Sequence, residues 1–112
     1  NIILDLQIDR VYLNLDSAIP CGLIVNELIS NSLKYAFDIN SGGIIKIMLT
    51  LEKEVIVLTV GDNGKGIPQD LKIEDSQTLG LQLISSLVEQ LEGELSLDRQ
   101  NGTIFTIKFK MD

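Results

Sequence analysis

Glu27 and Asn31 are four residues apart in a segment whose apolar residues recur at helical spacing. In a helix, this spacing places a carboxylate and a carboxamide on one face, and Lys34 continues the same stripe one turn further on. Oxygen ligands of this kind suit Mg²⁺, which keeps several of its water ligands in proteins. Because every amphipathic helix also has a polar face, the spacing alone leaves an ordinary solvated face as the alternative.

A second polar cluster, Asp62-Asn63-Gly64-Lys65-Gly66, directly follows an apolar stretch that is typical of a strand. A carboxylate at a strand end can accept a hydrogen bond from an exocyclic amine such as that of adenine. Gly64 and Gly66 would let the backbone approach a flat ring closely. An ordinary Asp-Asn-Gly turn is the alternative, although a hairpin turn would lead directly into another strand, whereas here a long stretch without periodicity follows.

Two further motifs could contribute to a nucleotide site, one by binding phosphates and the other by supporting the base. Thr78-Leu79-Gly80-Leu81 opens a second apolar-periodic segment, where the N–H groups and the dipole of a helix start favour an anion. Residues 67–78 then form either a lid between the two ends of a site or a surface connection. Thr103 would lie beside Asp62 if their strands are neighbours. Taken alone, each motif is more typical of a structural role.

The periodicity of the apolar residues predicts the elements that position these groups. The expected strands cover 2–8, 11–14, 44–51, 55–60, 94–98 and 103–110. One long helix is expected from about Asp16 to Phe37 and another from 79 to 91, with the loop 61–78 between the two strand pairs. Hairpins separated by helices predict an α+β fold: a two-layer sandwich of a mixed, mostly antiparallel sheet with helices packed on one face.

Helix boundaries and core-facing stripes also follow from the pattern. Asp16 or Ser17 is expected to cap the first helix, with Pro20 in its first turn, and Gly93 to end the second helix as its C-terminal cap. The apolar stripes that should face the core include Leu23, Leu33 and Leu83.

Length and composition exclude several classes of function. The 112 residues fit one domain, and 45% apolar residues suffice for a core. The net charge of −7 argues against nucleic acid or an anionic membrane surface as a partner, and means that any phosphate ligand needs a metal ion or backbone dipoles to offset repulsion. Cys21 is the only cysteine, which favours a buried small hydrophobe in a reducing, cytoplasmic compartment. The chain contains no histidine.

The order of the motifs resembles that of the GHKL ATPase superfamily, the Bergerat-fold group that includes histidine kinases and DNA gyrase. NELISNSLKYAF (26–37) is similar to its N box, DNGKGIP (62–68) to its first glycine box, and TLGLQLISSLVEQLEGEL (78–95) to its second. The closest resemblance is to histidine kinases of the second HisKA dimerisation class. It covers nearly the whole chain, and implies that 1–112 form one histidine kinase catalytic and ATP-binding domain.

The resemblance also implies roles for individual residues. Asn31 would bind Mg²⁺, Glu27 would stand at the general-base position of the superfamily, and Lys34 would act beside it at the phosphates. Asp62 would bind the adenine amine. The remaining residues that would line the ATP are Tyr35, Gly64, Lys65, Gly66, Ile67, Thr78, Leu79, Gly80, Leu81 and Thr103. Thr78 stands where many histidine kinases have a further glycine, and the short lid has no phenylalanine box.

The implied activity is transfer of the γ-phosphate of Mg-ATP to a histidine. Because the chain has no histidine, the acceptor would lie on a dimerisation domain of the same parent protein. The resemblance leaves open whether the parent is attached to a membrane, which this domain would not touch. A response regulator would act downstream. Three alternatives share the fold: a serine kinase of the anti-sigma type, an ATP-hydrolysing clamp in which Glu27 activates water, and a nucleotide sensor without catalysis.

Overall fold

The computed structural model describes residues 1–37, 42–64 and 80–111. In chain order the elements are β1 (Ile2–Ile8), α1 (Leu15–Asn31), a π-helical turn η1 (Ser32–Ala36), β2 (Gly43–Glu52), β3 (Val55–Asp62), α2 (Leu81–Gln90), β4 (Glu94–Asp98) and β5 (Thr103–Lys110). No helix within these ranges is long and apolar enough to cross a membrane.

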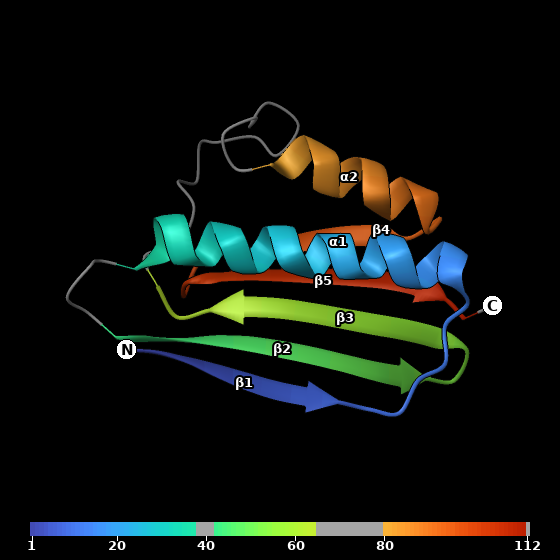
Figure 1. Ribbon diagram of the computed structural model, residues 1–112, viewed down its shortest axis with the longest axis horizontal. Coiled ribbons are helices and arrows are strands. Elements are labelled where there is room, and N and C mark those ends of the chain that lie inside the picture. Colours follow the sequence, from blue (N-terminus) through green and yellow to red (C-terminus); the bar gives the residue numbers. More distant parts are fainter. Residues whose placement is uncertain (38–41, 65–79, 112) are drawn as a thin grey trace.

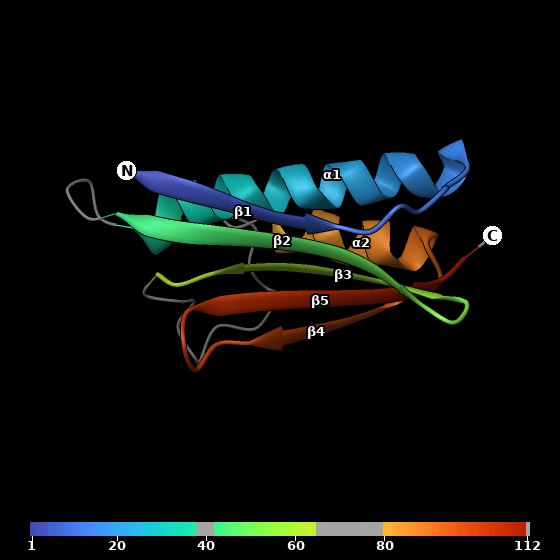
Figure 2. The ribbon, with the colours of Figure 1, turned by 90° about the horizontal axis from the view of Figure 1, so that it is seen from below.

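The strands form one sheet in the order β1-β2-β3-β5-β4 (Figures 1 and 2). β1 pairs with β2 in parallel because the chain crosses over through α1 between them, whereas the other neighbours are antiparallel. The two expected hairpins, β2–β3 and β4–β5, are therefore confirmed, as is the mixed and mostly antiparallel sheet.

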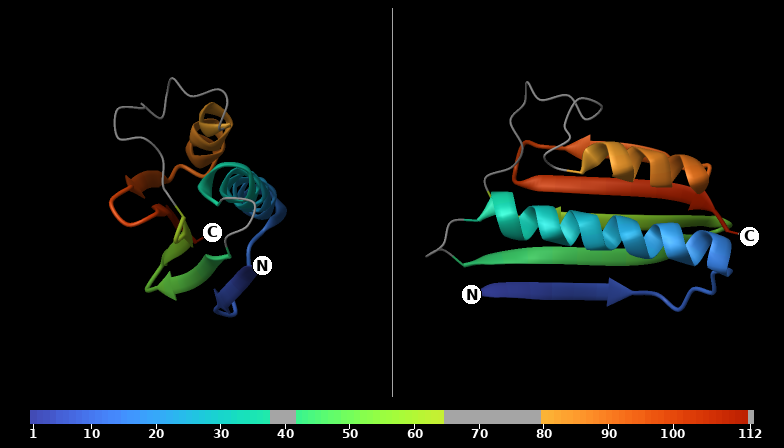
Figure 3. Two further views of the ribbon diagram at one scale, coloured as in Figure 1. Left: turned by 90° about the vertical axis from the view of Figure 1, so that its left-hand side faces the viewer. Right: turned by 45° about the horizontal axis from the view of Figure 1, so that its top comes forward.

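Both helices cover one face of the sheet, and the core lies between the two layers (Figure 3). Alternate residues of β5 are buried and half-buried or exposed, as expected for a strand with one face toward a core. The fully buried side chains come from both layers: Ile24, Leu28, Ile45, Ile56, Leu58, Val60, Leu81, Ile84 and Ile107. The predicted two-layer α+β sandwich is confirmed.

The first helix begins earlier than expected. The Asn14 side chain caps it by accepting a hydrogen bond from the backbone N–H of Ser17 at 3.2 Å. Residues 11–14 therefore connect the two layers, and the predicted second strand is wrong. Pro20 consequently lies in the second turn of α1, with its side chain buried, rather than in the first turn.

The second helix also differs from the prediction at both ends. Gly80 precedes its first turn, and Glu92 rather than Gly93 takes the left-handed conformation after its last turn, with φ 53°. The N–H of Glu92 donates to the carbonyl of Glu89 at 2.9 Å, and that of Gly93 donates to the carbonyl of Val88 at 3.0 Å. These bonds form a Schellman motif in which Gly93 is the second residue beyond the cap.

Three leucines of the expected apolar stripes do not face the core. Leu83 is 47% exposed, and Leu23 and Leu33 are similarly exposed, whereas Ile84 is completely buried. Residues four apart drift by about 40° around a helix at each step, so a stripe built only on this spacing turns away from the core.

Candidate nucleotide-binding site

Asp62 ends the central strand β3 as a buried carboxylate that is held from two sides. Its exposure is 9%. The Ser32 hydroxyl donates to Oδ2 at 2.9 Å, and the backbone N–H of Gly64 donates to Oδ1 at 3.0 Å. Because β3 extends through Asp62, this carboxylate belongs to the rigid sheet rather than to the expected loop. A carboxylate has about four acceptor positions, so this one retains capacity for a further donor.

Ser32 is the site residue that sequence analysis missed. It follows Ile24 and Leu28 at four-residue spacing, in the stripe of α1 that faces the core, and it is buried. A hydroxyl in an apolar stripe needs a buried partner, since an unpaired buried polar group is costly. The signal was therefore present, although the partner lies thirty residues further along the chain.

The expected uniform helix changes its winding at Ser32. Ser32–Ala36 form a π-helical turn, a rare conformation that occurs frequently at functional sites. Ser32 and Ala36 are buried in this turn, while Lys34 and Tyr35 between them are exposed. The turn therefore places Ser32 against Asp62 and directs two polar side chains outward from the same short segment.

Gly64 packs directly against the end of η1. A Cβ at this position would collide with the carbonyl oxygen of Ala36, so only glycine fits. The backbone after Asp62 thus lies close to η1, a packing reason for Gly64, whereas its expected approach to a flat ring stays a prediction. Lys65, Gly66 and the proposed lid at 67–78, with Ile67 and Thr78, lie outside the described residues, as does Leu79.

Thr103 is the direct cross-strand neighbour of Asp62. The register of β3 and β5 pairs the two residues, and Thr103 is buried. The condition set for this residue, that its strand should lie beside that of Asp62, is therefore met.

Glu27 and Asn31 lie one turn apart on α1, and Glu27 lies against the start of α2. Both side chains are half-buried. Glu27 Oε2 lies 2.5 Å from the position that a Cβ on Gly80 would take, so that the carboxylate touches the backbone where α2 begins. Asn31 follows one turn later, directly before Ser32. One helix therefore joins the Asp62 end of the site to the α2 end.

The start of α2 offers backbone groups rather than side chains. Gly80 is the N-cap with φ 65°, a left-handed conformation that favours glycine, and it has no side chain to accept hydrogen bonds from the first turn. Leu81 is completely buried in the core, so only its backbone can face a ligand. This arrangement suits an anion at the helix start.

The side chains of this site that could hold Mg²⁺ supply oxygen ligands. Within residues 1–37, 42–64 and 80–111, no group of three or more histidine, cysteine, aspartate or glutamate side chains could hold a metal ion. Mg²⁺ is commonly bound through one or two protein oxygens together with substrate phosphates and water. Asn31 and Glu27 can supply such oxygens.

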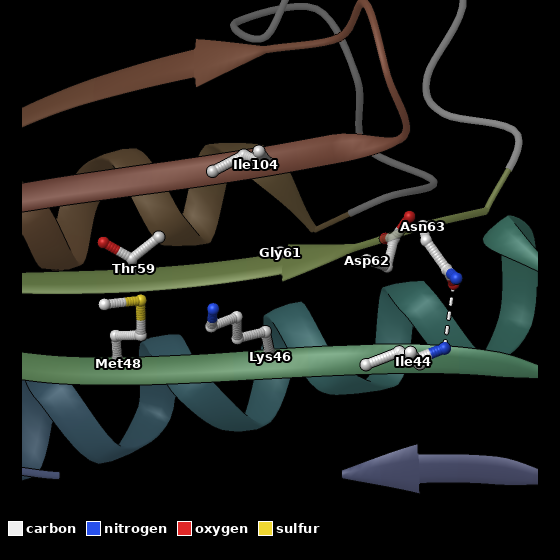
Figure 4. A pocket seen from close by; sticks show the side chains of 8 residues that line it. All are labelled: Ile44, Lys46, Met48, Thr59, Gly61, Asp62, Asn63 and Ile104. Atoms are coloured by element: carbon white, nitrogen blue, oxygen red, sulfur yellow. Dashed lines mark hydrogen bonds between the residues drawn. The ribbon is translucent and has the colours of Figure 1, made fainter. Parts of the chain in front are cut away.

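A hollow of about 360 Å³ lies on the opposite, open face of the sheet, between β2, β3 and β5 (Figure 4). Lys46, Met48 and Ile104 are among the residues that line it. Asn63 belongs to this side, where its Oδ1 accepts a hydrogen bond from the N–H of Ile44 at 2.8 Å. Asp62 also borders the hollow, but its carboxylate bonds to Ser32 in the helical layer. The hollow is therefore separate from the site formed by α1, η1 and α2.

Comparison with known proteins agrees with this geometry. Residues 17–112 match the family model described as histidine kinase-, DNA gyrase B-, and HSP90-like ATPase. The chain belongs to this family. The match includes every residue assigned to the site, from Glu27 on α1 to Thr103 on β5.

Relatives of this ATPase domain include named histidine kinases. Blue-light-activated histidine kinase 2 of Erythrobacter litoralis is 32% identical over 105 residues, which are 92% of this chain and 30% of the relative. Sensor histidine kinase PdtaS of Mycobacterium tuberculosis is 32% identical over 106 residues, 88% of this chain and 21% of the relative. The domain thus spans less than a third of these relatives.

Solved structures also resemble this ATPase domain closely. The histidine kinase domain of Erythrobacter litoralis EL346 blue-light activated histidine kinase superposes with a TM-score of 0.90 at 30% identity, covering 98% of this chain and 52% of that chain. Histidine kinase AdeS of Acinetobacter baumannii shares the fold, with a TM-score of 0.81 at 24% identity over 99% of this chain and 55% of that chain.

Proposed function

We propose that this domain binds Mg-ATP and donates its γ-phosphate to a histidine on a separate dimerisation domain of the same parent protein, from which a response regulator is then phosphorylated. The observation that carries the proposal is the buried carboxylate of Asp62, fixed by Ser32 and Gly64 at the end of the central strand. A group held so rigidly and with spare acceptor capacity suits the recognition of one base.

Asp62 accepts a hydrogen bond from the exocyclic amine of adenine in this proposal. Guanine has a carbonyl oxygen at the corresponding position, which an acceptor repels, so the site selects adenine over guanine. Thr103 and Gly64 border the base, and Lys65, Gly66 and Ile67 complete this end of the site. Tyr35, exposed on η1, lies toward the ribose.

The phosphates occupy the space between α1 and the N-terminus of α2. Backbone N–H groups at Gly80 and Leu81 bind them, together with Thr78 and Leu79, and the helix dipole adds a favourable field. Asn31 holds Mg²⁺, and Lys34 supplies a further positive charge. The domain has a net charge of −7 and would repel a bare polyphosphate. In Mg-ATP, part of the phosphate charge is already neutralised by the metal ion.

Phosphoryl transfer depends on positioning and charge stabilisation more than on covalent help from the protein. Asp62 fixes the base, the start of α2 fixes the phosphates, and α1 sets the separation between them. Glu27 stands beside the phosphate end, where a carboxylate can orient the attacking imidazole or, in a hydrolytic relative, a water. The imidazole comes from outside this chain, which contains no histidine.

Labelling with γ-labelled ATP tests the proposed reaction. The domain alone should acquire no acid-labile, base-stable label, and addition of the parent's dimerisation helices should produce such label on those helices. Asn31→Asp should reduce the labelling greatly by disturbing the Mg²⁺ site. Rapid phosphate release from the domain alone would instead indicate a clamp ATPase, and acid-stable label on a protein partner would indicate a serine kinase. Nucleotide binding without either reaction would indicate a sensor.

A further inference from the structure

The Glu27 carboxylate fills the space where a side chain on Gly80 would lie. Its Oε2 and Cδ are 2.5 and 3.4 Å from the position of a Cβ on Gly80. Among the described residues, no other side chain and no backbone atom outside the immediate neighbours of Gly80 comes within 4 Å of that position. Gly80 therefore leaves room for Glu27, in addition to taking a left-handed conformation.

This contact supplies α2 with a negative charge that its own sequence lacks. The first turn of α2 has no acidic residue, and its N-cap has no side chain. Carboxylates are favoured at the positive end of a helix dipole. Glu27 provides one from α1, which contacts α2 and runs in the opposite direction beside it (Figure 1).

The same helix start is where the proposed function places the phosphates of ATP, and the inference rests on that proposal. A carboxylate and a bare polyphosphate repel each other, whereas a divalent cation between them is attracted to both. We propose that Glu27, which lies against Gly80 at the N-terminus of α2, makes ATP binding depend on Mg²⁺, because its charge opposes the free nucleotide and favours the metal complex.

The size of the effect follows from Coulomb's law. In bulk water, two unit charges about 4 Å apart change an equilibrium constant by about fivefold, and partial burial strengthens the interaction. Glu27→Gln removes the charge and keeps the shape of the side chain. This variant should therefore bind ATP in EDTA about five- to tenfold more tightly than the wild type, and its gain in affinity from Mg²⁺ should shrink by at least the same factor.

Calorimetric titration of ATP in EDTA and in Mg²⁺ measures these affinities. Asp16→Asn is the matched control, since it removes the same charge about 16 Å earlier along α1, beyond the screening length of physiological salt. It should keep the wild-type dependence on Mg²⁺. An equal dependence in wild type and Glu27→Gln would overturn the inference and leave the proposed function intact. A wild-type domain that binds ATP in neither condition would refute the proposed function, and the inference with it.

Discussion

Replacement of Asp62 by asparagine separates recognition of the base from support of the fold. In the wild type, the Asp62 carboxylate accepts hydrogen bonds from Ser32 at 2.9 Å and from Gly64 at 3.0 Å. Asparagine keeps one acceptor oxygen for Gly64, and its amide can donate to the Ser32 oxygen in place of accepting. We therefore expect a loss of about 1–2 kcal/mol in the free energy of unfolding, because two charge-assisted bonds become neutral ones.

The loss of ATP affinity should be larger than the loss in the free energy of unfolding. With its oxygen bonded to Gly64, the asparagine presents an amide N–H to the adenine amine, so two donors face each other. Loss of a hydrogen bond to a charged acceptor is worth about 1.5–3 kcal/mol, which predicts an ATP affinity about 10- to 100-fold weaker. GTP and ITP have a carbonyl at that position, so their affinity should fall less or rise.

Calorimetry with ATP, GTP and ITP, together with melting of the nucleotide-free variant, provides the assay. Asp98→Asn is the matched control, because Asp98 is an exposed carboxylate that accepts a backbone hydrogen bond from Gln100 at 3.0 Å in the β4–β5 turn. It should bind ATP like the wild type. A folded Asp62→Asn domain with unchanged ATP affinity and unchanged preference for adenine would refute the assignment of Asp62. An unfolded variant would show that Asp62 is needed mainly for the fold.

Three further predictions concern packing and the support of the site. Ile84→Ala should cost roughly 2–5 kcal/mol in unfolding by denaturant, whereas Leu83→Ala should cost less than about 1 kcal/mol; equal costs would contradict the burial pattern of α2. Ser32→Ala should lower stability by about 1–3 kcal/mol by leaving the buried Asp62 carboxylate one donor short, while Ser30→Ala, two residues earlier, should not. Equal melting temperatures for the two variants would contradict the Ser32–Asp62 bond. Burial raises the pKa of the Cys21 thiol above its ordinary value, so the folded domain retains a proton that the unfolded chain releases. The stability from this difference is present below about pH 9 and falls as the pH rises further, and Cys21→Ala should flatten that fall in denaturant titrations between about pH 8 and 10.

Local patterns predicted most of the elements, because strands and hairpins depend on alternation and turn residues that are close in sequence. The helix boundaries were less accurate. Asn14, Asp16 and Ser17 are all good N-caps, and the choice of Asn14 depends on where the chain leaves β1, which no local pattern records. Leu83 fits a four-residue stripe as well as a core position, and only packing against the sheet distinguishes the two.

The site was predicted residue by residue but not as a set of contacts. Asp62 and Gly64 were proposed from their motif, whereas the Ser32–Asp62 bond joins residues thirty positions apart and depends on the π-helical turn. The π-helical turn covers only five residues, which is too short a stretch for the apolar periodicity to reveal a change of winding. The contact between Glu27 and Gly80 likewise depends on two helices that meet only in the folded domain.

The position at which ATP binds is the most direct test of the proposed site. Backbone amide shifts of an isotopically labelled domain, followed during titration with Mg-ATP, report which residues surround the nucleotide. The largest changes should fall on Ser32, Gly64, Gly80 and Thr103, in the helical layer and at the adjoining ends of β3 and β5. Changes concentrated instead on Lys46, Met48 and Thr59, which line the hollow on the open face, would contradict the proposed site.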